Sequence, residues 1–94
     1  MTLSELLDEL ERVDLETYRK WFNDYDILGL DQWQLDSLQG CIQRACERRE
    51  WGFIICNQVA NVCTKTSTYA SEIYDTPAEA LLAAYIAAVK EEKR

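Results

Sequence analysis

The chain has 94 residues, of which 48% are hydrophobic, and it contains one proline and three glycines. This length fits one domain, and this composition is too apolar for a disordered chain. The formal net charge is −7, and all of it lies in residues 1–40, which hold ten acidic and three basic side chains. Because phosphates need cations, we expect no direct nucleic-acid partner and favour a protein partner with a basic surface. The alternative is an acidic surface that only keeps the protein soluble.

The first residues, Met1–Glu5, lack a basic segment, and acidic side chains soon interrupt the apolar ones. We therefore expect no signal peptide, and no run approaches the roughly 18 apolar residues of a membrane span. These features predict a cytoplasmic protein with no membrane partner. In that compartment the four cysteines are expected as free thiols.

Three helices are predicted in residues 1–50. Thr2 with Glu5 forms a capping box ahead of one apolar stripe. Asp14 is the next expected cap, before an aromatic-rich helix that Gly29 is expected to end. Asp31 with Gln34 is a third capping pair, and its helix is expected to end near Glu50. The apolar positions are Leu3, Leu6, Leu7, Leu10 and Val13, then Leu15, Tyr18, Trp21, Phe22 and Tyr25, then Leu35, Leu38, Ile42, Ala45 and Cys46.

At residue 51 the sequence pattern changes from helical to strand-like. Residues 51–56 are aromatic and isoleucine-rich, which predicts a strand, and residues 57–61 suggest a loose hairpin loop. Residues 62–69 alternate with high β-propensity, and a further short strand is expected within residues 70–74. Thr76 can then cap the backbone N–H of Glu79, with Pro77 at the first position of a final helix.

Few residues suit catalysis or metal binding. The chain has no histidine, so the usual general base and the commonest zinc ligand are absent. The cysteines (Cys41, Cys46, Cys56 and Cys63) form no CxxC pair, although the last two could approach each other across the hairpin. We expect no enzyme activity, no metal and no cofactor.

One basic cluster consists of Arg44, Arg48 and Arg49. Cations at a helix C-terminus interact favourably with the helix dipole, which explains such a cluster without a ligand. The alternative is a clamp for a phosphate or carboxylate, assisted by Tyr69 or Tyr74.

From residue 51 to residue 90 the pattern resembles the phage ABA-sandwich type of small domain. The resemblance is carried by Trp51 and Phe53 at the start of a strand, the alternating stretch to Tyr74, and the helix start at residues 76–81. It implies a sheet covered by helices, no catalytic residues, and a small accessory protein of a phage or other mobile element, which would act in the host cytoplasm. Residues 1–40 do not match that family.

Together these patterns predict a single α+β domain over residues 1–94. Residues 1–50 are expected to be mainly helical and acidic, residues 51–74 to form a β-hairpin or meander, and residues 76–91 to form the C-terminal helix. The antiparallel sheet of two or three strands is expected to pack against helices.

The leading functional hypothesis is a protein that binds and inhibits a host protein complex, such as a CRISPR effector, by occupying its basic nucleic-acid-binding surface. The predicted partner-binding residues are Glu5, Asp8, Glu9, Glu11, Glu16, Asp24 and Asp26, with Trp21 or Tyr25 as the apolar anchor. The second hypothesis is an oligomeric small-ligand binder, for which a homodimer would suffice, that sequesters an anionic signalling molecule. Its predicted anion-binding residues are Arg44, Arg48, Arg49, Tyr69 and Tyr74.

Overall fold

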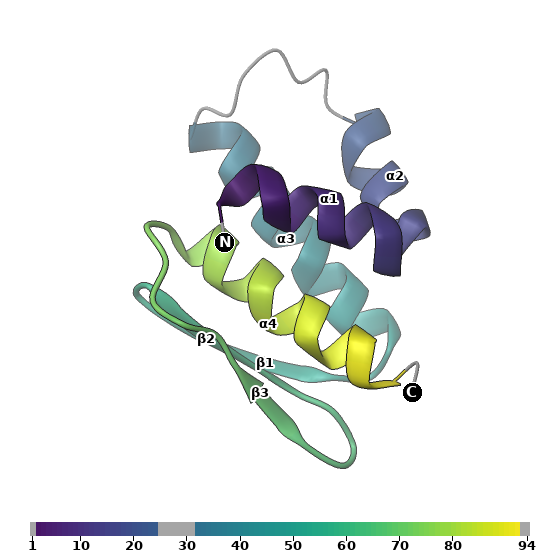
Figure 1. The fold of residues 1–94 in the computed structure, drawn as a ribbon, viewed down its shortest axis with the longest axis vertical. Coiled ribbons are helices and arrows are strands. Elements are labelled where there is room, and N and C mark those ends of the chain that lie inside the picture. The colour runs from purple at the N-terminus through teal and green to yellow at the C-terminus, as the bar shows by residue number, and fades with distance from the viewer. Residues whose placement is uncertain (1, 25–31, 93–94) are drawn as a thin grey trace.

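The computed structural model describes residues 2–24 and 32–92. Within these ranges the chain forms four helices and three strands, which confirms the predicted α+β fold (Figure 1). In chain order the elements are α1 (Leu3–Val13), α2 (Leu15–Asp24), α3 (Gln32–Arg48), β1 (Gly52–Cys56), β2 (Val59–Cys63), β3 (Thr68–Ala70) and α4 (Pro77–Glu92).

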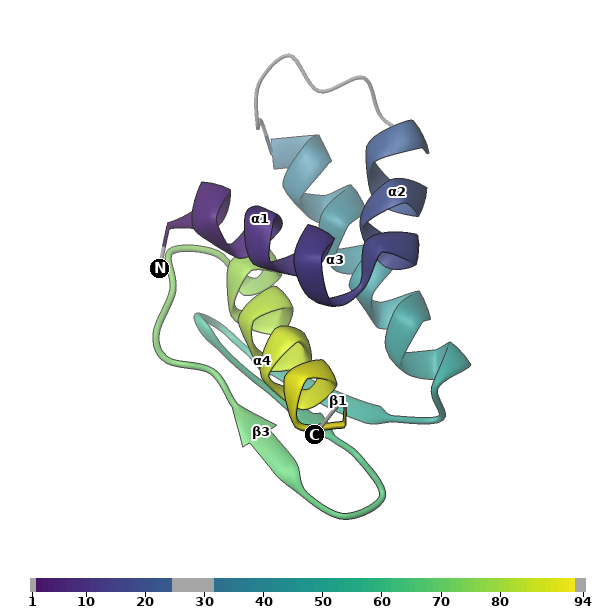
Figure 2. The ribbon, with the colours of Figure 1, turned by 45° about the vertical axis from the view of Figure 1, so that its right-hand side comes forward.

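Helix α4 is the centre of the molecule. It lies between the sheet and the helices α1 and α3, and it contacts all three strands (Figures 1 and 2). A helix that is apolar on all sides must be covered on all sides, and the alanine- and leucine-rich sequence of α4 has this character. Its buried residues are Ala78, Ala80, Leu81, Leu82, Ala84, Tyr85, Ile86, Ala88 and Val89.

The sheet is an antiparallel meander with strand order β1-β2-β3. Its inner face packs on the helices, and β2 supplies the fully buried residues Ala60 and Val62. Side chains of a strand alternate between the two faces, so Ile54 points to the outer face, where it is 61% exposed. The sheet therefore has one covered and one open face.

The structure corrects two predicted strand boundaries. The first hairpin loop is not loose: Cys56 pairs with Val59, so only two residues turn the chain. Asn57 makes this possible with a φ of 55°, because asparagine tolerates the left-handed region better than most residues. The expected strand over residues 62–69 is interrupted after Cys63, and β3 begins only at Thr68.

Side chains close the second turn of the meander. The hydroxyl of Thr64 accepts hydrogen bonds from the backbone N–H groups of Thr66 and Ser67, at 3.3 and 3.1 Å. The N–H of Thr64 donates to the carbonyl of Ser67 at 2.8 Å. A threonine that bonds the backbone two and three residues ahead stabilises a turn in place of an extended strand.

Three predicted helix caps are confirmed. Thr2 and Glu5 form the complete capping box of α1, and Asp14 accepts from the N–H of Thr17 at 3.3 Å at the start of α2. At the start of α4, the N–H of Glu79 donates to the hydroxyl of Thr76 at 3.3 Å. The signals predicted at Gly29 and Asp31 lie outside the described residues. Helix α3 ends at Arg48, just before Glu50, which has a φ of 61°.

Replacing Thr76 with alanine is expected to lower the free energy of unfolding by about 1 kcal/mol, because the N–H of Glu79 loses its partner. Urea denaturation followed by circular dichroism measures this change. The control is Thr66→Ala, at an exposed turn position whose side chain caps no helix; a midpoint for Thr76→Ala that equals the wild-type midpoint would contradict the cap.

Candidate functional site

The outward side of α1 carries a row of exposed carboxylates. Leu6 and Leu10 bury one side of the helix against the core, and the side opposite to them faces solvent. Glu5, Asp8 and Glu11 are exposed and follow one another at intervals of three residues, which makes them neighbours on the helix surface. We call these three residues the acidic edge.

Glu5 also belongs to the capping box. Its carboxylate accepts the backbone N–H of Thr2 at 3.0 Å. The hydrogen bond from this N–H, and the further one with the Thr2 side chain, lower the pKa of Glu5. The capping box thus keeps one member of the acidic edge ionised and fixed in orientation.

Apolar surface lies beside the acidic edge on α2. Tyr18 is half-buried; burial raises its pKa, and the charges of Glu11 and Asp8 raise it further. Leu15, one turn earlier on α2, is 42% exposed. Neither residue was predicted as a contact residue, since both fit the apolar period of α2.

The structure removes two residues from the predicted partner-binding set. Trp21 is only 1% exposed, so its position in the apolar period of α2 makes it a core residue and not a surface anchor. Glu9 is 8% exposed and forms ion pairs with Arg12 and with Lys90, the latter at 2.8 Å. The bond from Lys90 is the largest cause that lowers the pKa of Glu9, and it joins α1 to α4.

The remaining predicted acidic residues differ in their surroundings. Glu16 is exposed and forms an ion pair with Lys20 at 3.5 Å along α2, so its charge is partly compensated. Nearby Arg19 is also exposed, which makes α2 less acidic than α1. Tyr25 and Asp26, together with the side chain of Asp24, lie outside the described part of the chain.

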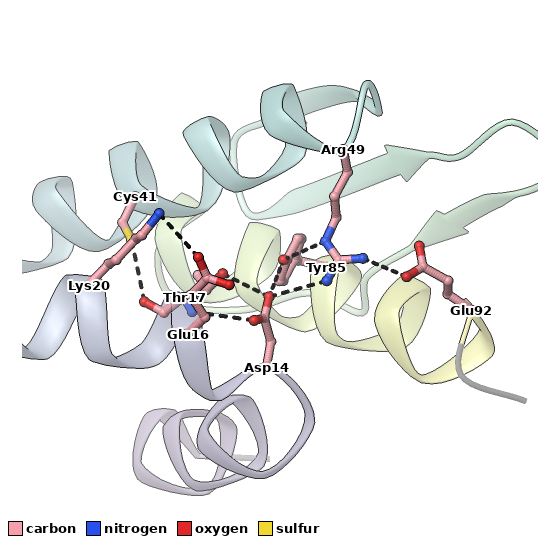
Figure 3. A network of polar contacts seen from close by, with 8 residues as sticks. All are labelled: Asp14, Glu16, Thr17, Lys20, Cys41, Arg49, Tyr85 and Glu92. Carbon is pink, nitrogen blue, oxygen red and sulfur yellow. Dashed lines mark hydrogen bonds and ion pairs between the residues drawn. The ribbon is translucent and has the colours of Figure 1, made fainter.

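A polar network lies behind the corner between α1 and α2 (Figure 3). Asp14 accepts hydrogen bonds from the hydroxyl of Thr17, at 2.7 Å, and from the hydroxyl of Tyr85 on α4. Arg49, just after α3, donates from Nε to the Tyr85 oxygen at 3.1 Å and lies 3.5 Å from Asp14. Arg49 also binds Glu92 at 2.7 Å. The network therefore joins α2 and α4 to the residue between α1 and α2 and to the segment after α3.

The network determines the protonation of its members. Burial alone would raise the pKa of Asp14, but the hydrogen bonds from Tyr85 and Thr17 and the charge of Arg49 outweigh it and lower that pKa. Burial and the hydrogen bond to Asp14 raise the pKa of Tyr85. Asp14 is thus held as a carboxylate and Tyr85 as a neutral phenol, which suits a structural link.

The network also changes the interpretation of the basic cluster. The guanidinium of Arg49 lies 4.9 Å from the ring centroid of Trp51 and is bound to two carboxylates, so its charge is already compensated. Arg44 and Arg48 are exposed. Arg48 borders a shallow pocket of about 280 Å³ that Asp14 and Glu16 also line.

The two predicted tyrosines do not complete an anion clamp there. Tyr69 and Tyr74 are half-buried, and neither lines the pocket of Arg48 and Arg49. Tyr69 borders a different hollow, of about 220 Å³, together with Trp51 and Lys65. The predicted anion-binding residues are therefore not gathered in one pocket.

All four cysteines are free thiols. Cys56 and Cys63 pair with Val59 and Gly52, at opposite ends of the β1–β2 ladder, so the predicted approach across the hairpin is wrong. Burial raises the pKa of the Cys46 thiol to about 12. In the part of the chain that the structure describes, no three potential metal-binding side chains converge. None of the described helices is both long and apolar enough for a membrane span.

The fold and its surface define a small α+β protein with an acidic helical edge and an internal polar network. No protein-family model matches the sequence, and no curated protein or solved structure is significantly similar to it. The resemblance of residues 51–90 to the phage ABA-sandwich type of domain stays a prediction.

Proposed function

We propose that this protein binds a basic surface of a host protein complex and blocks nucleic-acid binding there, as an inhibitor of a defence system such as a CRISPR effector. The observation that supports this most is the acidic edge. Asp8 and Glu11 are exposed, and among the described residues no cation lies within ion-pair distance of either. Their charge is therefore available to a partner, whereas that of Glu9 is compensated within the protein and that of Glu16 is compensated in part.

The neighbouring residues of α2 give this surface an apolar part. The charges of Asp8 and Glu11 act on the phenol of Tyr18, and Leu15 is exposed at the start of the same helix. Tyrosine in the centre of an interface often contributes strongly to binding, while charged residues at the rim accelerate association and select the partner. We therefore assign the anchor role to Tyr18 and Leu15 in place of Trp21.

The anion-binding alternative has less support. Arg49 is held by Asp14, Tyr85 and Glu92, and the pocket beside it also presents the carboxylates of Asp14 and Glu16. An anion placed there would meet two negative side chains in addition to the arginines. Only Arg44 and Arg48 remain as exposed cations of the predicted set.

The double variant Asp8→Lys, Glu11→Lys is expected to lose the partner that wild-type protein captures from a bacterial lysate. Wild type and variants are immobilised in parallel, and the bound proteins are compared by quantitative mass spectrometry. Capture by the wild type is expected to fall steeply with salt, because exposed charges are screened. Circular dichroism verifies that each variant is folded.

Two matched variants make this experiment specific. Glu47→Lys with Glu72→Lys changes the net charge equally at two other exposed positions, and it is expected to retain the partner. Arg44→Glu with Arg48→Glu is also expected to retain it. If the arginine variant loses the partner while the Asp8 and Glu11 variant keeps it, the proposal is wrong and the anion-binding function replaces it.

A further inference from the structure

Strand β1 is an edge strand without the features that usually protect edges. Among the strands that the structure describes it is hydrogen-bonded to β2 alone, and its sequence, Gly-Phe-Ile-Ile-Cys, contains no charge and no proline. Its register with β2 runs without a bulge from Gly52 to Cys56. Natural sheets usually block such an edge with lysine, proline, a bulge or a covering segment, because the free edge can pair with another strand.

The register shows which backbone groups of β1 face outward. In β2, the carbonyl of Ala60 accepts the N–H of Ser71, so the backbone of Ala60 points toward β3. Because backbone groups alternate along an antiparallel strand, Val59 and Asn61 point toward β1 and bond with Cys56 and Ile54.

The intervening residues of β1, Phe53 and Ile55, therefore direct their N–H and C=O groups away from the sheet. Four hydrogen-bonding groups, two donors and two acceptors, lie along this edge.

The exposure of the side chains shows that this edge is open. On the inner face, Phe53 and Ile55 are only partly buried, while Ala60 and Val62 of the neighbouring strand are 1% and 0% exposed. On the outer face, Ile54 is 61% exposed. The helices thus cover the middle of the sheet completely and the β1 side only partly, which leaves apolar surface on both sides of the free backbone groups.

We propose that β1 pairs with β1 of a second copy of this chain, antiparallel and centred on Ile54. In that register Phe53 lies opposite Ile55 of the second copy, and the symmetric pair repeats this arrangement, so all four outward groups are bonded. Two copies of Ile54 meet at the two-fold axis on the outer face. The result is one continuous sheet of six strands.

The charge distribution fits a second copy at this place. The net charge of −7 lies entirely in residues 1–40, so contacts between two copies through that half of the chain repel. In the proposed register the uncharged strand faces itself, and the flanking Glu50 lies opposite Gln58 of the second copy, which avoids a like-charge pair. The other edge strand, β3, has only three residues and offers a shorter ladder.

The first test is the variant Ile54→Lys, which places two lysines opposite each other at the axis. Sedimentation velocity over a concentration series is expected to show the wild type rising from 10.9 kDa toward twice that mass. Ile54→Lys is expected to weaken the dimer about tenfold or more. The control, Ile73→Lys, changes an exposed residue outside the strands and is expected to dimerise as the wild type does.

The second test identifies the register. In a Cys56→Ser, Cys63→Ser background, Ile54→Cys is expected to form a covalent dimer on mild oxidation, because residues opposite each other in a non-hydrogen-bonded pair have Cα atoms about 4.5 Å apart. Ile73→Cys in the same background is the control and is expected to form no covalent dimer on oxidation, because residue 73 lies outside the paired strand. A wild type that stays at 10.9 kDa throughout the series, or an Ile54→Lys variant that dimerises like the wild type, would overturn the proposal.

Discussion

The variant Leu82→Ala is expected to lower the free energy of unfolding by about 2–5 kcal/mol, because it opens a cavity in the middle of the core. Leu82 is 0% exposed and belongs to α4, which contacts the sheet, α1 and α3. A cavity at this position has neighbours on several elements, so the surrounding side chains cannot move in to fill it without disturbing other contacts. For a domain of this size, a loss of 2 kcal/mol lowers the melting temperature by roughly 8–16 °C.

Leu15→Ala is the matched control, because it removes the same atoms from a side chain that is 42% exposed. Its effect on the free energy of unfolding is expected to stay below about 1 kcal/mol. Thermal and urea denaturation of both variants provide the comparison. Equal losses from Leu82→Ala and Leu15→Ala would show that α4 is not the centre of the core.

The second large effect is expected from Asp14→Asn. Asparagine is as good a helix cap as aspartate, so the cap of α2 is retained. The substitution removes the negative charge that faces Arg49 and replaces the carboxylate that accepts the hydrogen bond of Tyr85 with a neutral amide. We expect the free energy of unfolding to fall by about 1–3 kcal/mol at neutral pH, because Arg49 and Tyr85 lose a charged partner in a partly buried place. Asp8→Asn, which changes an exposed carboxylate, is the control and is expected to have little effect.

The pH dependence provides a further test of this network. The pKa of Asp14 is lowered in the folded protein, so the stability it contributes is fully present above its unfolded pKa of about 3.9. That contribution is lost as the pH falls through the folded pKa. The difference in stability between wild type and Asp14→Asn is therefore expected to be constant above about pH 5 and to shrink below about pH 4. A difference that does not change with pH would contradict a charged role for Asp14.

The sequence predicted the features that depend on residues close together in the chain. The caps at Thr2, Asp14 and Thr76 each join residues three apart, so their residue types and spacing are sufficient signals. The turn at Asn57 was misjudged because the expected signal, glycine, is replaced there by asparagine in a left-handed conformation.

The polar network could not be predicted, because it joins residues that only tertiary packing brings together. Asp14, Arg49 and Tyr85 are far apart in the chain, and each had a sufficient local explanation as a cap, a helix-end cation or a core aromatic. One signal was available: Tyr85 places a hydroxyl in the middle of an otherwise apolar helix, and a buried hydroxyl needs a partner. Trp21 was misassigned because periodicity identifies the apolar face of α2 without showing what covers it.

The position of α4 has a consequence for how the protein is made. This helix packs against α1, α3 and every strand, yet it follows all of them in the chain. During synthesis the ribosome therefore releases Leu6, Leu10 and the inner side of the sheet before the helix that covers them exists. The chain is therefore expected to complete its core only after residues 77–92 emerge, with these apolar surfaces exposed to chaperones until then.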